Sequence, residues 1–91
     1  MAHNFKYSSG QILYYVNPFV FTIELIQVQF TLIEEDGTPF YIDNVGAYLY
    51  EWDLFLYLDD AKQDAIKRLK KFYQEKEWEI LHSNPTKIVE D

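Results

Sequence analysis

The sequence contains no cysteine. Disulfide frameworks, thiolate metal sites and cysteine nucleophiles are therefore excluded. Glycine is scarce and scattered, which excludes a glycine-rich phosphate-binding loop; the three positions are Gly10, Gly37 and Gly46. No apolar run is long enough to span a bilayer, and the N-terminus has neither the basic start nor the apolar stretch of a signal peptide. We expect a cytoplasmic protein without a membrane partner.

What the chain does have is enough apolar material for one hydrophobic core. It is 91 residues long, and apolar residues make up 48% of it and aromatic residues 19%, too large a share for a disordered protein. We interpret residues 11–82 as a single α+β domain. Residues 1–10 are interpreted as a flexible N-terminal segment and residues 83–91 as a polar C-terminal tail.

Basic residues are nearly missing from the first two thirds of the chain. Residues 1–60 contain one basic residue, Lys6, and nine acidic residues, a net charge of −8, whereas residues 61–91 have a net charge of +1. A body with this charge repels nucleic acid and membrane phosphates and attracts basic protein surfaces. The same charge also helps to keep an aromatic-rich protein in solution.

Residues 12–33 have the pattern of two strands. Residues 12–16 are rich in β-branched and aromatic side chains, and Asn17-Pro18 then supplies a turn. Residues 19–33 alternate between polar and apolar, but the phase changes at Leu25-Ile26. A single inserted residue reverses which side of a strand faces the core, so we predict a β-bulge or sharp bend at that point.

The turn Glu35-Asp36-Gly37 joins the second strand to a third. A two-residue loop would mix polar and apolar residues on both faces of the hairpin, whereas a three-residue loop with a left-handed Gly37 separates them. The predicted pairs are Leu32–Phe40 and Phe30–Ile42 on one face, with Thr31–Tyr41 and Gln29–Asp43 on the other.

Residues 47–58 also alternate, with an entirely apolar set at the even positions. One strand, two strands divided by a bend at Glu51-Trp52-Asp53, and a short helix all remain open. One helix can cover only one face of a sheet, so Leu49, Phe55 and Tyr57 are expected to form an exposed apolar patch. This patch predicts a homodimer.

A helix is predicted for residues 61–76, with Asp60 as N-cap and Gln63 in a capping-box position. Its apolar stripe should pack on the sheet and comprises Ala61, Ala65, Ile66, Leu69, Phe72 and Tyr73. Asp64 and Glu75 are spaced for ion pairs with Arg68 and Lys71. A last short strand is possible around Trp78. The predicted fold is a small, twisted antiparallel sheet of four to five strands with one amphipathic helix packed on one face.

The residues available for catalysis are few, and none has a recognisable nucleophile–base spacing. His3 and His82 lie near the ends of the chain, and the basic helix residues around Lys67 and Arg68 are interpreted as a solvated face. Glu51 and Asp53 would share a strand face and could act as paired carboxylates, but a surface for a partner is the favoured interpretation. We therefore expect no enzyme, no metal site and no cofactor.

A resemblance is carried by the run Val28-Gln29-Phe30-Thr31-Leu32-Ile33-Glu34-Glu35-Asp36-Gly37, followed by Phe40-Tyr41, an acidic aromatic stretch and a helix. This part of the chain resembles the short uracil-DNA glycosylase inhibitors of Bacillus phages. The resemblance implies a dimer that presents carboxylates in place of DNA phosphates. It also implies an apolar side chain that enters the enzyme, for which Trp52 or Phe55 would be the analogous position.

The predicted function is a non-catalytic acidic binding protein that occupies a basic site on a protein partner. A nucleic-acid-mimicking inhibitor of a DNA- or RNA-handling enzyme is its specific form, and no direct nucleic-acid binding is expected. The alternatives are a self-associating interaction module and an immunity or antitoxin protein. The predicted partner-binding residues are Glu34, Glu35, Asp36, Glu51, Trp52, Asp53 and Phe55.

Overall fold

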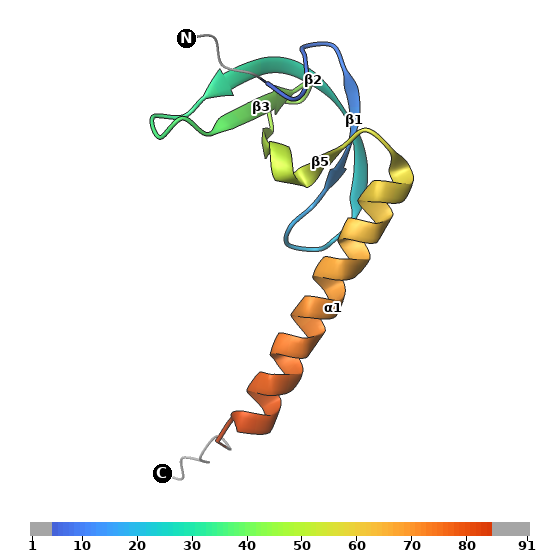
Figure 1. The fold of residues 1–91 in the computed structure, drawn as a ribbon, viewed down its shortest axis with the longest axis vertical. Coiled ribbons are helices and arrows are strands. Elements are labelled where there is room, and N and C mark those ends of the chain that lie inside the picture. Colours follow the sequence, from blue (N-terminus) through green and yellow to red (C-terminus); the bar gives the residue numbers. More distant parts are fainter. Residues whose placement is uncertain (1–4, 85–91) are drawn as a thin grey trace, which may run out of the picture.

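The computed structural model describes residues 5–84, and these form a five-stranded antiparallel sheet with one long helix (Figure 1). The strand order is β4-β3-β2-β1-β5, so the α+β fold expected from the sequence is confirmed. A short 3₁₀ helix, η1, joins β4 to β5. The elements are β1 (Ile12–Val16), β2 (Ile23–Ile33), β3 (Pro39–Asp43), β4 (Tyr48–Tyr50), η1 (Glu51–Asp53), β5 (Leu54–Phe55) and α1 (Leu58–His82).

The long strand β2 belongs to both halves of the sheet. Its first half pairs with β1 and its second half with β3, and the register shifts between Val28 and Phe30. The predicted bulge therefore exists, but its position at Leu25-Ile26 is wrong. The error comes from Glu24, which lies on the same side of β2 as the buried Ile26 and Val28. Glu24 is near the start of the strand, where that side is exposed, so no bulge is needed to place it in solvent.

Strand β2 also begins later than predicted, because the chain turns between β1 and β2. The side-chain oxygen of Asn17 accepts hydrogen bonds from the N–H groups of Phe19 and Val20, at 2.9 and 3.3 Å. Phe21 has a φ of 61°, in the left-handed region that non-glycine residues rarely adopt. These local bonds place residues 18–21 in a turn rather than in the strand.

The three-residue hairpin loop is confirmed. The N–H of Glu34 donates to the carbonyl of Thr38 at 2.9 Å, which leaves residues 35–37 as the loop, and Gly37 has a φ of 89°. The pairs Leu32–Phe40, Phe30–Ile42 and Thr31–Tyr41 form as predicted. The pair Gln29–Asp43 is wrong, because the bulge places Val28 opposite Asp43.

The sheet curls around a core. Leu49 in β4 and Leu54 in β5 lie at opposite ends of the strand order, yet they belong to one buried cluster. The other members of this cluster are Tyr7, Leu13, Ile26, Val28 and Tyr41. Strongly twisted small sheets enclose a core in this way without a second sheet.

The segment before β1 contributes to this core. Tyr7 is buried; its N–H donates to the Tyr41 hydroxyl at 3.2 Å, and its own hydroxyl donates to the carbonyl of Leu54 at 3.0 Å. The interpretation of residues 1–10 as a segment outside the domain is therefore wrong for Tyr7. Residues 1–4, which include His3, and residues 85–91 of the expected C-terminal tail lie outside the described residues.

Helix α1 is longer at both ends than the predicted 61–76. It begins at Leu58 after Tyr57, and no side chain caps its first turn, so the Asp60 N-cap is wrong. Residues around Trp78 are helical and not a strand, since no proline or glycine interrupts the helix-forming sequence before Pro85. Of the two expected intrahelical ion pairs, Arg68–Asp64 forms, whereas Lys71 and Glu75 do not pair among the described residues.

Only the first part of α1 packs on the sheet. Ala61 and Ala65 are buried against Val16 in β1, on the outer surface of the β1–β5 half, and Phe72 contacts Phe21 at 5.7 Å between ring centroids. The expectation that the whole apolar stripe covers a sheet face is therefore wrong. The rest of the helix projects away from the sheet, as Figure 1 shows.

Candidate partner-binding surface

An apolar surface covers the outer side of the sheet half formed by β3, β4 and the second part of β2. Strand pairing aligns Phe30 with Ile42 and Tyr48, and Leu32 with Phe40 and Tyr50. Side chains alternate along a strand, so these six residues point to one side, away from the buried Tyr41 and Leu49. We call this surface the aromatic face; its residues are Phe30, Leu32, Phe40, Ile42, Tyr48, Tyr50 and the adjoining Trp52.

The aromatic face is open to solvent, and its rings are held against one another. Tyr48 is 71% exposed, Trp52 59% and Phe30 54%. The rings of Tyr50 and Trp52 stack in parallel with centroids 4.6 Å apart, and Phe40 lies 5.7 Å from Tyr48. Exposed apolar patches of this kind on small proteins mark binding surfaces. Helix α1 covers the outer side of the β1–β5 half, and no described element covers this one.

This arrangement reverses the predicted exposure of residues 47–58. Leu49 is buried in the core, and Phe55 packs against Val16, Ala61 and Ala65, so neither belongs to an exposed patch; only Tyr57 is exposed as predicted. The reason is that Leu49 pairs with Tyr41, whose large side chain fills the interior of the curled sheet. Of the three open possibilities for this segment, the structure has two strands divided at Glu51-Trp52-Asp53.

The acidic hairpin loop borders the aromatic face. The hydroxyl of Tyr50 donates a hydrogen bond to Glu34, which attaches this carboxylate to the edge of the face. Glu34 raises the pKa of the Tyr50 hydroxyl through that hydrogen bond. Glu35 and Asp36 are exposed in the loop, and the N–H of Thr38 donates to Asp36 at 2.9 Å, which lowers the pKa of this carboxyl.

The side chain of Glu51 is held in place by two hydrogen bonds. Its carboxylate accepts a hydrogen bond from the Tyr41 hydroxyl at 2.6 Å and one from the N–H of Lys6 at 2.9 Å. These bonds attach the N-terminal segment to the sheet. Glu51 is therefore half-buried and fixed in place, and contributes less to the free acidic surface than predicted.

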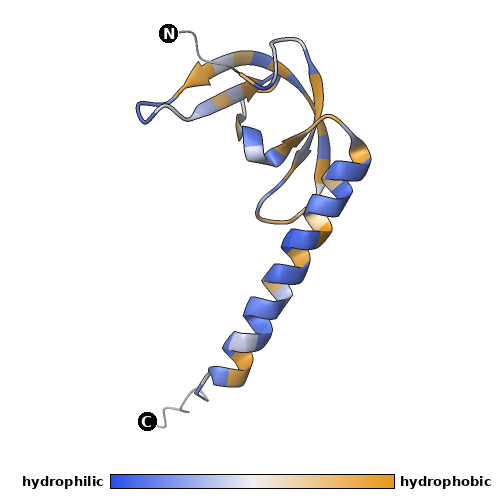
Figure 2. Ribbon diagram, in the orientation of Figure 1, coloured by the Kyte–Doolittle hydropathy of each residue, from blue (hydrophilic) through white to orange (hydrophobic). Residues whose placement is uncertain are grey.

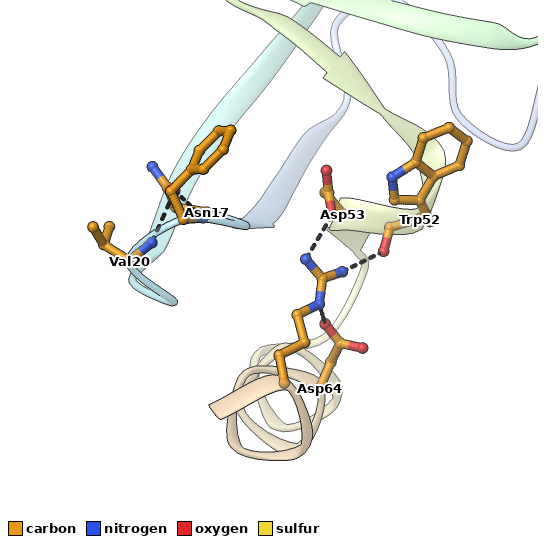
Figure 3. A network of polar contacts seen from close by, with 7 residues as sticks. Asn17, Val20, Trp52, Asp53 and Asp64 are labelled. Atoms are coloured by element: carbon orange, nitrogen blue, oxygen red, sulfur yellow. Dashed lines mark hydrogen bonds and ion pairs between the residues drawn. The ribbon is translucent and has the colours of Figure 1, made fainter. Parts of the chain in front are cut away.

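The prediction that Asp53 binds a partner is wrong. Its side chain is buried, and Arg68 of α1 donates to it from Nη1 at 2.7 Å. The same guanidinium donates from Nη2 to the carbonyl of Trp52 at 2.9 Å and lies 2.6 Å from Asp64 (Figure 3). Asp53 and Glu51 do not share a strand face as predicted, because they lie in η1 and make different contacts. Asp53 therefore anchors the helix and is not free to meet a partner.

Of the seven predicted residues, the structure brings together Glu34, Glu35, Asp36 and Trp52 around one surface. Phe55 and Asp53 are directed to the helix instead. The prediction missed Phe30, Phe40, Tyr48 and Tyr50. Their alternation was recognised, but a period-two pattern does not say which of its two faces is the buried one.

The pH dependence of stability should report on Tyr41. Burial, with the hydrogen bond to Glu51, raises the pKa of this hydroxyl from 10.0 to about 12. The folded state then holds a proton that the unfolded state releases, so the stabilisation is complete below pH 10 and declines as the pH rises to about 12. We expect the urea midpoint to fall over this interval. Burial raises the pKa of Tyr15, and the hydrogen bond to Glu34 raises the pKa of Tyr50, so both hydroxyls contribute to the decline in the same direction.

Tyr41→Phe should remove part of that decline, while the matched change Tyr48→Phe on the exposed face should leave it as in the parent protein. The measurement is urea unfolding followed by circular dichroism at pH values from about 9 to about 12, a range that contains the interval between the ordinary and the raised pKa of Tyr41. Equal pH profiles for Tyr41→Phe and the parent would contradict the assignment.

Among residues 5–84, no group of three or more histidine or acidic side chains is placed to hold a metal ion. No helix in this part of the chain combines the length and the apolar content needed to cross a membrane. Comparison of the chain with protein-family models, curated proteins and solved structures finds no match. The resemblance to uracil-DNA glycosylase inhibitors therefore stays a prediction.

Proposed function

We propose that this protein is a non-catalytic binding module whose aromatic face binds a basic segment of a protein partner. The observation that carries the proposal is an uncovered aromatic sheet face bordered by carboxylates. The chain between residues 28 and 53, which supplies this surface, contains no lysine or arginine, and its carboxylates Glu34, Glu35 and Asp36 lie at the border of the aromatic face. The surface therefore offers anionic groups and aromatic rings without a cation of its own.

Arginine and lysine suit such a surface in two ways. Their charged groups are attracted to the faces of tryptophan and tyrosine rings, with Trp52 and Tyr48 the most exposed here. They also pair with carboxylates, and Glu34, Glu35 and Asp36 lie at the adjacent hairpin. A segment that combines arginine with apolar residues would bury the apolar part of the face and neutralise its rim.

The test uses two short peptides of equal length, one alternating arginine with leucine and the other alternating glutamate with leucine. We expect the arginine peptide to shift the NMR signals of Tyr48, Tyr50 and Trp52, with an affinity that falls as salt increases. Trp52→Ala should weaken this binding about tenfold, since it removes an exposed ring that stacks on Tyr50. Replacing Glu34, Glu35 and Asp36 together by amides should reduce the salt dependence.

Trp78→Ala is the matched control, because Trp78 is 62% exposed on the projecting helix, away from the aromatic face. Its substitution should leave peptide binding unchanged. Equal binding of the glutamate peptide, or an equal loss in Trp78→Ala and Trp52→Ala, would reject the proposal.

The more specific form of the proposal is that the partner is a DNA- or RNA-handling enzyme whose basic groove is occupied. The net charge of −8 on residues 1–60 supports it. If it is right, a partner identified by affinity capture should be released by duplex DNA in competition with this protein. If this chain is instead an immunity or antitoxin protein, its toxin partner would bind through the same charges but would not be released by DNA.

A further inference from the structure

The projecting part of α1 has an apolar seam of its own. Ile66, Tyr73 and Ile80 recur every seven residues, and Leu69 lies between the first two, which is the spacing of a two-helix coiled coil. Their side chains are exposed, from 38% for Leu69 to 73% for Ile80. In Figure 2 apolar bands recur along α1 to its C-terminal end, beyond the sheet. Ile80 lines a shallow groove together with Tyr73, Lys76, Glu77 and Leu81.

This seam is distinct from the side of α1 that packs on the sheet. Ala61, Ala65 and Phe72 face the domain, while Ile66 and Tyr73 lie around the helix from them. The seam also extends past the last contact with the sheet. A short helical segment has only marginal stability in water by itself, and in proteins it is usually stabilised by packing of its apolar side. The projecting part of α1 therefore calls for such packing.

We infer that the seam binds a second copy of this chain, with the two α1 helices antiparallel. Leu69 of each copy then packs against Ile80 of the other copy. Because the dimer has two-fold symmetry, this pair occurs once at each end of the contact. Tyr73 comes opposite Lys76 of the second copy, whose aliphatic stem can cover the ring while its ammonium group lies near the ring face.

Charge decides the orientation. Lys70 and Glu77 occupy equivalent positions one heptad apart, on the same edge of the seam. In an antiparallel pair like positions face each other, so Lys70 of each copy comes close to Glu77 of the other. In a parallel pair Lys76 would face Lys76 within the seam, and Lys70 would have no acidic neighbour across it. The antiparallel arrangement also places the two sheet domains at opposite ends of the helix pair.

The lack of native cysteine allows a direct test of the pairing. Leu69→Cys and Ile80→Cys variants are purified, mixed and oxidised. The mixture should form a disulfide between the two variants, because these positions are adjacent in the proposed dimer. Each variant alone should not cross-link, because its two cysteines would be about 16 Å apart along the helices, beyond the reach of a disulfide.

Charge reversal tests the orientation independently, by sedimentation equilibrium of the full chain. Lys70→Glu or Glu77→Lys alone should raise the dimer dissociation constant about tenfold, since each change replaces two attractive contacts by two repulsive ones. The double variant Lys70→Glu/Glu77→Lys should restore it. This rescue keeps the test independent of any loss of folding in a single variant, which circular dichroism checks.

Three results would overturn the inference. They are a monomeric parent protein at micromolar concentration, a Leu69→Cys variant that cross-links by itself, and a dimer that is unaffected by both single charge reversals.

Discussion

Replacement of Arg68 by alanine is expected to lower the free energy of unfolding by about 3 kcal/mol. Asp53 is only 4% exposed, and the Arg68 guanidinium is the cation that pairs with it. Without Arg68 the carboxylate would remain buried and unpaired, and the carbonyl of Trp52 would lose its donor. Arg68 itself is 23% exposed, so water can replace part of the lost interaction, which places the effect at the lower end of the range for broken buried pairs.

The effect is measured by urea unfolding, with Lys67→Ala as the control because Lys67 is exposed on the same helix. Arg68→Ala should cost much less in an Asp53→Asn background, where no buried charge is left unpaired. If Arg68→Ala were as mild as Lys67→Ala, the ion pair would not anchor the helix to the sheet.

Tyr41→Ala should destabilise the fold by about 4 kcal/mol. Tyr41 has an exposed fraction of 0%, and its ring lies within 6.0 Å of Phe5 and 5.9 Å of Tyr7 between centroids. Its hydroxyl also joins Glu51 to the N–H of Tyr7. Removal of the side chain leaves a large cavity in the curled sheet. Tyr41→Phe, which removes only the hydroxyl, should cost about 1 to 2 kcal/mol.

Tyr48→Ala is the matched control, since Tyr48 lies on the neighbouring strand with its side chain on the opposite, exposed face. It should change stability by about 0.5 kcal/mol at most. A cost for Tyr48→Ala as large as that for Tyr41→Ala would mean that the aromatic face is buried, and would remove the basis of the proposed partner-binding surface.

The sequence by itself determined the hairpin between β2 and β3. Asp36-Gly37 and the sorting of polar and apolar residues were enough to define the three-residue loop and the pairing of β2 with β3 from Phe30 to Leu32. These features depend on neighbouring residues and on the left-handed conformation that glycine adopts readily. The charge asymmetry that motivates a basic partner is likewise a property of the chain alone.

Only the tertiary structure decided which side of each element is buried. The curl of the sheet buries Tyr41, Asp43 and Leu49 and leaves the more aromatic face in solvent, against the hydrophobic pattern. Asp43 tolerates burial because it accepts hydrogen bonds from the N–H groups of Val45 and Ala47. Asp53 tolerates burial because Arg68, 15 positions later in helix α1, donates a hydrogen bond to it. Such partners are distant in the sequence or belong to the backbone, so no periodicity records them.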